Sequence, residues 1–249
     1  MKKSVSSLVL AMFLLSGTAW SSTIAYMSGS SEPWGSNSNI SAMNIAFGSG
    51  KWNRISFSDS FSKYSTLYID GGGNTSTDFG AFVRANRSAL ENYVLAGGRL
   101  FLNAAVWGDG TSLVFGASIG NEGEPYSSRG YAEDITNPIF NGAGASWGGD
   151  NFSHSEVQAA GFTTFITGQS GNAILSGARK GKGYVLIGTQ TNTDFHYSLN
   201  DSDPFQLRVN ELRYVAQVNT IPEPETYALM GFGLVALTLR MRRRKTTPR

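Results

Sequence analysis

The chain has 249 residues, no cysteine, and 20 basic against 18 acidic residues, for a formal net charge of +2. Without cysteine the protein has no disulfide, no thiolate metal ligand and no thiol nucleophile, so its stability must come from a packed core. Eight of the basic residues lie in two terminal segments that are typical of targeting signals, which leaves 12 basic and 16 acidic residues between them. This central part is acidic by about four charges, which argues against a nucleic-acid partner.

The N-terminus has the order of a secretory signal peptide. Two lysines open the chain, an apolar run at 8–15 follows them, and small residues come after the run. We expect cleavage just before Ser22, with a cut after Ala19 as the alternative, because small residues precede both positions. The apolar run is too short for a permanent membrane span. Residues 1–21 are therefore predicted to be a signal peptide, and a buried N-terminal helix is the alternative.

Residues 22–219 are long enough for one sizeable domain, which we expect to be a single α/β globular unit. Its first half alternates short apolar runs with amphipathic stretches, which indicates strands and helices in turn. The expected elements are a strand at 23–27, a helix at 39–47 and a strand at 65–70, the last followed by three glycines.

A helix over residues 79–96 is the clearest pattern in the chain. Apolar residues, Leu90 and Val94 among them, fall on one face, and charged or polar residues fall on the other. Thr75 and Asp78 form a predicted capping box before the helix, and two glycines end it.

A strand at 99–104 follows this helix and completes a right-handed βαβ unit, which predicts that strands 23–27, 65–70 and 99–104 are parallel in one sheet. The second half is looser, with residues 121–147 expected to be loops around short elements. The remaining expected elements are a strand at 162–167, a hairpin of 173–178 with 184–189 across the basic turn 179–183, and a closing helix at 204–217 with Asp203 as N-cap.

Residues 220–249 contain three features in a fixed order. An uncharged, mostly apolar stretch at 226–239 would be about 21 Å long as a helix, against a hydrocarbon core of roughly 30 Å. The prolines before it stop the helix from extending backwards, and the basic cluster after it would hold that end in the cytoplasm. We therefore expect a short transmembrane helix that halts translocation. The flanking residues are Pro222, Glu223 and Pro224 before the stretch, and Arg240, Arg242, Arg243, Arg244 and Lys245 after it.

This order closely resembles the PEP-CTERM sorting signal of Gram-negative bacteria. The resemblance implies recognition by an exosortase, a membrane-embedded cysteine transpeptidase. The protein would be anchored transiently in the inner membrane with its body in the periplasm. The tail would then be removed near the Pro-Glu-Pro, and the body would pass to the cell surface or extracellular matrix. An ordinary single-span anchor is the alternative. Such tails occur on unrelated bodies, so the tail says nothing about the chemistry of the body.

The body has its own resemblance, carried by the stretches "LENYVLAGGRLFLNAA", "NPIFNG", "GKGYVLIGTQ" and "PFQLRVNELRYVA". This pattern resembles the class I glutamine amidotransferase-like superfamily in its trehalose-utilisation-like branch. The resemblance implies a flavodoxin-like three-layer sandwich with a mainly parallel sheet. The catalytic cysteine of the amidotransferases has no counterpart, because Asn103, Ala104 and Ala105 stand at the corresponding place. No catalytic residue is carried over.

The weak candidates for a catalytic site are three polar residues that follow predicted strands. Asp70 opens "DGGGNTST", where an anion site at a helix N-terminus and a tight turn are both open interpretations. His196 with Asp194 suggests general acid–base work, a Ca²⁺ site or ordinary loop polarity. Neither the P-loop lysine nor a metal-binding or cofactor-binding spacing occurs, so we expect no metal and no cofactor.

Aromatic side chains in glycine-rich loops offer a different kind of contact. Trp34, Trp107 and Trp147 are suited to stacking on sugar rings or to packing against their own loops. Two functions follow from these patterns. The first is a noncatalytic surface or matrix protein that binds a glycan or another protein in a biofilm or exopolysaccharide. The second is a secreted carbohydrate-active hydrolase that uses carboxylates and His196, and the lack of a nucleophile motif favours the first.

Overall fold

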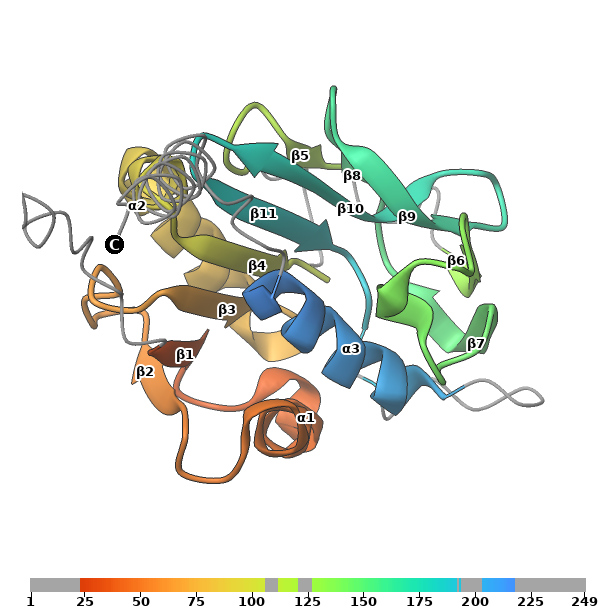
Figure 1. The fold of residues 1–249 in the computed structure, drawn as a ribbon, viewed down its shortest axis with the longest axis horizontal. Helices are drawn as coiled ribbons and strands as arrows, with labels where there is room; N and C mark the ends of the chain where they lie inside the picture. Colours follow the sequence, from red (N-terminus) through yellow and green to blue (C-terminus); the bar gives the residue numbers. More distant parts are fainter. Residues whose placement is uncertain (1–22, 106–111, 121–126, 192, 194–202, 218–249) are drawn as a thin grey trace, which may run out of the picture.

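The protein is known from a computed structural model, which describes residues 23–105, 112–120, 127–191, 193 and 203–217. In these residues a nine-stranded sheet has the order β2-β1-β3-β4-β11-β10-β9-β6-β7 (Figure 1). Its first five strands are mutually parallel. They are β2 (Asn53–Ser56), β1 (Ile24–Ser28), β3 (Thr66–Asp70), β4 (Arg99–Asn103) and β11 (Gly183–Gly188).

The other half of the sheet is an antiparallel extension. Strand β10 pairs antiparallel with β11, and β9, β6 and β7 continue the alternation. Seven of the nine strands therefore point the same way, all but β6 and β10. The extension comprises β10 (Ala173–Lys180), β9 (Thr163–Gly168), β6 (Ser127–Ala132) and β7 (Ser146–Ser153), and a separate two-stranded sheet joins β5 (Ser118–Ile119) to β8 (Val157–Gln158).

Helix α2 (Ser76–Leu95) covers one face of the parallel half and is the helix predicted from the sequence. Leu90 and Val94 are fully buried in a core that includes Leu67 and Leu102 from the strands beneath them. Gly97, with φ of 119°, ends the helix as expected. The close approach of α2 to β11 leaves no room for a side chain at Gly183. An added Cβ there would lie 2.2 Å from the carbonyl oxygens of Val94 and Gly98.

Helices α1 (Ser38–Phe47) and α3 (Pro204–Gln217) cover the other face. Figure 1 shows both on the viewer's side of the sheet, with α2 behind it. A second core fills this side, built from Tyr26, Tyr68 and Phe101 of the strands together with apolar residues of the two helices. Strands β1, β3 and β11 are buried along their whole length because helices cover both faces. The protein is thus a mixed α/β fold of three layers, consistent with a flavodoxin-like arrangement.

The predicted βαβ unit is confirmed, since β1, β3 and β4 are parallel neighbours. The closing helix is also confirmed, and the Asp203 Oδ1 accepts from the Gln206 N–H at 2.8 Å as an N-cap does. The capping box is wrong: the Thr75 side chain makes no cap bond and its hydroxyl instead donates to the carbonyl of Gly72 at 2.9 Å.

Three strands of the large sheet were not predicted. Strand β2 is a short, largely exposed edge strand. Strand β6 lies in the segment 121–147 that was expected to be mostly loops, and β7 begins at the end of that segment. The expected transmembrane helix at 226–239 and the signal peptide lie outside the described residues. Within the described part of the chain, no helix is both long and apolar enough to cross a membrane.

Candidate functional site

The carboxyl ends of the parallel strands bring polar side chains from distant parts of the sequence together. Asp70 and Asn103 end β3 and β4 as register partners, and Gln190 follows β11 by two residues. Ligands of open α/β sheets bind at this edge, so the side chains found here determine which ligands or reactions the protein can support.

Asp70 is the centre of this group and is 2% exposed. Its Oδ2 accepts hydrogen bonds from Tyr68 Oη at 2.7 Å, Asn39 Nδ2 at 2.9 Å and Asn103 Nδ2 at 3.1 Å. Its Oδ1 accepts from the backbone N–H of Gly72 at 2.8 Å. In every one of these contacts the partner is the donor and the carboxylate the acceptor. The carboxylate is therefore committed to internal hydrogen bonds.

The network extends from Asp70 towards the β2 edge of the sheet. Asn39 Nδ2 also lies 3.2 Å from Tyr26 Oη, which donates to Glu32 Oε2 at 2.8 Å. Glu32 is 7% exposed and pairs with the half-exposed Arg54 at 2.5 Å. Burial raises the pKa of Glu32, although the bond from Tyr26 and the charge of Arg54 act in the opposite direction.

On the other side the network passes through Asn103 to helix α3. Asn103 Nδ2 also donates to the carbonyl of Gln190 at 2.9 Å, and Gln190 Nε2 donates to Glu211 Oε1. Glu211 is fully buried, and its Oε2 lies 3.4 Å from Arg208 Nη1. Burial raises the pKa of Glu211, with Arg208 and the Gln190 bond opposing the effect.

Arg208 is 2% exposed and lies against the sheet rather than in solvent. Its guanidinium carbon is 5.3 Å from the ring centroid of Phe101 and 5.7 Å from that of Tyr68. Arg208 and Glu211 were not among the site residues predicted from the sequence, although both lie in the closing helix predicted at 204–217. The available signal was that two opposite charges stand three residues apart in an otherwise amphipathic helix.

The place where an amidotransferase would carry its nucleophile holds no reactive group. Asn103, Ala104 and Ala105 are all fully buried at the end of β4. The Ala104 N–H donates to the carbonyl of Gly188 at 2.7 Å, and the Ala105 carbonyl accepts from the Gly73 N–H at 3.3 Å. Both alanines are held by the backbone of their neighbours.

Trp34 is the distinctive aromatic residue of this edge. Its φ of 51° is a left-handed conformation that is rare for a bulky residue. The ring covers Gly72 and Gly73, and an added Cβ on Gly72 would lie 2.1 Å from it. His154, which is 7% exposed, stacks on Trp34 with ring centroids 6.3 Å apart. Trp34 is only partly buried.

The other predicted site residues are distributed differently. Trp147 is 2% exposed and packs in the core against Phe140, so it is a packing residue. Asp194 and His196 lie outside the described residues, as do Trp107 and the basic and Pro-Glu-Pro residues of the C-terminal segment. Among the residues that the structure describes, no group of three or more His, Asp or Glu is arranged to hold a metal ion.

Comparisons with known proteins bear on the two parts of the chain separately. Residues 220–244 match the PEP-CTERM protein-sorting motif, which covers the predicted sorting residues except Lys245. No curated protein matches the chain. A protein from Thermoplasma acidophilum described as a GMP synthase subunit has a TM-score of 0.51 at 10% identity, over 79% of this chain and 94% of that one. A ThuA-like protein from Bacteroides uniformis has a TM-score of 0.48 at 14% identity, over 78% and 90% of the two chains.

The class of protein follows from these findings. The PEP-CTERM motif is the signal that exosortase recognises, so this is an exported, exosortase-sorted protein with a C-terminal anchor during sorting. Its body is similar in fold to the Thermoplasma protein described as a GMP synthase subunit. At these identities the likeness concerns the fold alone.

Proposed function

We propose that this protein is a noncatalytic binding protein that exosortase sorting delivers to the cell surface or extracellular matrix, where it retains polysaccharide. The observation that carries the proposal is the state of Asp70. Its carboxylate is 2% exposed and accepts four internal hydrogen bonds, so it is not available to take a proton from a substrate.

The surroundings of Asp70 support the same interpretation. A hydrolase of this fold would need a nucleophile or an activated water at the carboxyl edge, and Ala104 and Ala105 offer neither. Trp34 at this edge is partly exposed, on a backbone held in a strained conformation. A rigid aromatic ring with a polar edge is a suitable platform for the apolar face of a sugar.

The test uses the full-length chain purified in detergent and incubated with soluble and insoluble polysaccharides. We expect retention of polysaccharide without release of new reducing ends. Trp34→Ala should weaken retention about tenfold, whereas Trp52→Ala, at a half-buried position on the other side of β1, should preserve it if the fold is intact.

Release of reducing ends that disappears in His196→Gln would overturn the proposal and make the protein a carbohydrate-active hydrolase. The absence of retention for every polysaccharide offered would overturn it as well.

A further inference from the structure

A groove made of two adjacent cavities lies along the outer side of α2, between this helix and the segment 57–62. It consists of a cavity of about 630 Å³ and a second of about 510 Å³. Four residues line both cavities, so the two are adjacent: Phe57, Ser58, Phe82 and Asn86. The helical residues that line it run from Asp78 to Ala96, which corresponds to about 27 Å along the helix axis. A groove of this length accommodates several units of a linear polymer.

The floor of the groove is a row of aromatic rings. Phe57 lies 5.2 Å from Phe82 between ring centroids, Phe61 lies 6.1 Å from Phe82, and Phe61 lies 5.8 Å from Tyr93. Phe57 is half-buried, and the other three are between 7% and 9% exposed. Packing against their neighbours fixes these rings, so a ligand meets a preformed apolar surface.

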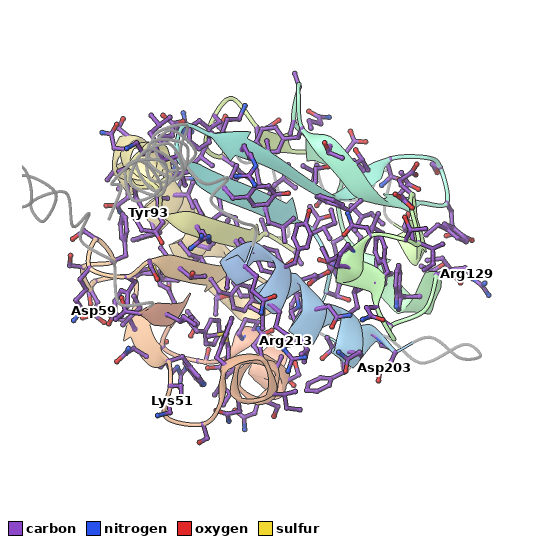
Figure 2. All side chains as sticks on the ribbon, in the orientation of Figure 1. Lys51, Asp59, Tyr93, Arg129, Asp203 and Arg213 are labelled. Atoms are coloured by element: carbon purple, nitrogen blue, oxygen red, sulfur yellow. The ribbon has the colours of Figure 1, made fainter. Side chains whose placement is uncertain are left out.

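The rim of the groove carries hydroxyl and amide groups. Ser58, Ser60 and Ser62 alternate with other residues along segment 57–62 and are all exposed. Asn92 is exposed on the opposite wall, formed by α2. Figure 2 shows Asp59 of segment 57–62 and Tyr93 of α2 on the same side of the molecule. Aromatic floor and hydroxyl-rich rim together match a ligand with apolar faces and hydroxyl edges.

The charge of the residues that line the groove argues against a negatively charged ligand. Among the described residues that line the two cavities, Asp59 and Asp78 are charged and none is a lysine or an arginine. The Asp59 carboxylate accepts from the Ser56 N–H at 2.7 Å and the Ser56 hydroxyl at 2.8 Å. These bonds lower the pKa of Asp59, so the groove stays negative. A polymer of uronic acids or phosphates would be repelled.

We propose that this groove is the polysaccharide-binding site, and that it takes a linear chain of uncharged or amino-bearing sugars with ring faces on Phe57 and hydroxyls on the serine rim. This assignment rests on the proposed function and adds the site and the class of ligand. The groove reaches Gly29 and Ser30, which directly follow β1. It therefore begins at the carboxyl edge of the parallel strands, the edge to which Trp34 also belongs.

The test places a long side chain in the groove by a substitution that should leave the fold intact. Ala89 is exposed on α2 and lines the groove, whereas its neighbour Ser88 is exposed and does not line it. Lysine is a good helix former, so Ala89→Lys and Ser88→Lys should both keep the unfolding midpoint of the parent. We expect Ala89→Lys to reduce retention of polysaccharide by about tenfold or more and Ser88→Lys to leave it unchanged.

Three probes distinguish the ligands: an uncharged β-glucan, chitosan and alginate. The proposal is supported if the parent retains the glucan or chitosan and Ala89→Lys does not. If chitosan alone is retained and salt weakens its retention, the ligand is an amino-bearing polysaccharide. Retention of alginate alone overturns the proposal, as does retention that is equal in the two lysine variants. The latter result leaves the proposed function standing, whereas a parent that retains no polysaccharide overturns both.

Discussion

Asn103 and Asp70 end neighbouring parallel strands as register partners, and the amide of the first donates to the carboxylate of the second at 3.1 Å. This bond closes the carboxyl edge of the sheet at a point where open α/β folds keep a ligand site. The same amide also holds the carbonyl of Gln190, so one side chain joins β4 to the chain after β11. At this edge Asn103 therefore has a structural role, because it joins β3, β4 and the chain after β11.

The first prediction concerns that junction. Asp70→Asn replaces one of the two acceptor oxygens with an NH₂ donor, which leaves at least one buried donor without an acceptor, and it removes a negative charge near Arg208. We expect the free energy of unfolding to fall by about 3 kcal/mol, measured by denaturant titration. Asp78→Asn, at an exposed position on α2, is the matched control. Equal midpoints for the two variants would show that the Asp70 network contributes little.

The second prediction is a pH dependence that comes from Glu211. Because burial raises its pKa above the ordinary value of 4.5, the folded protein binds this proton more tightly than the unfolded chain. The contribution is fully present below about pH 4.5 and is lost as the pH rises through the raised pKa. Glu32 acts in the same direction.

Glu211→Gln removes the titrating group and keeps a side chain of the same shape. We expect the stability of the parent, relative to this variant, to decrease as the pH rises above about 4.5. Denaturant titrations at a series of pH values measure the difference, and Glu133→Gln, at an exposed position, should follow the parent. A difference between parent and Glu211→Gln that is constant with pH would contradict the assignment.

The third prediction tests the packing of α2. Val94 is fully buried against the sheet, whereas its neighbour Leu95 is 45% exposed. Val94→Asp brings an unpaired charge into the core and should cost on the order of 4 kcal/mol, while Leu95→Asp should cost much less. Thermal unfolding followed by circular dichroism compares the two. Similar melting temperatures would mean that α2 packs on the sheet through another face.

The parallel half of this fold could be predicted because its signals are local. An apolar strand, a helix of clear periodicity and the Gly97-Gly98 break define the βαβ unit without any long-range information. The start of α3 was equally clear, since Asp203 and Pro204 form a standard N-terminus.

Strands β6 and β7 of the antiparallel half could not be predicted, because their conformation depends on contacts between strands and not on the local sequence. Strand β6 is "SSRGYA", whose composition does not favour a strand. Its Gly130 is needed because the Phe152 ring of β7 packs directly over it, where an added Cβ would lie 2.3 Å away. That requirement comes from the partner strand and is invisible in the local sequence. The burial of Arg208 and Glu211 is likewise set by Gln190 and two aromatic rings that are distant in sequence.

The last prediction concerns sorting, and it rests on the PEP-CTERM match at 220–244. The apolar stretch 226–239 is about 21 Å long as a helix, short of a hydrocarbon core of roughly 30 Å. Basic side chains that reach the headgroup layer would make up this deficit and hold the end on the cytoplasmic side. We therefore expect that neutral residues in place of Arg242, Arg243, Arg244 and Lys245 will impair membrane retention and tail processing in the native host. Immunoblots of membrane and secreted fractions measure both, and replacing Thr246 and Thr247 with alanine is the control for disturbance of the tail. Processing and delivery at the parental level in the neutral variant would show that the basic cluster does not have this role.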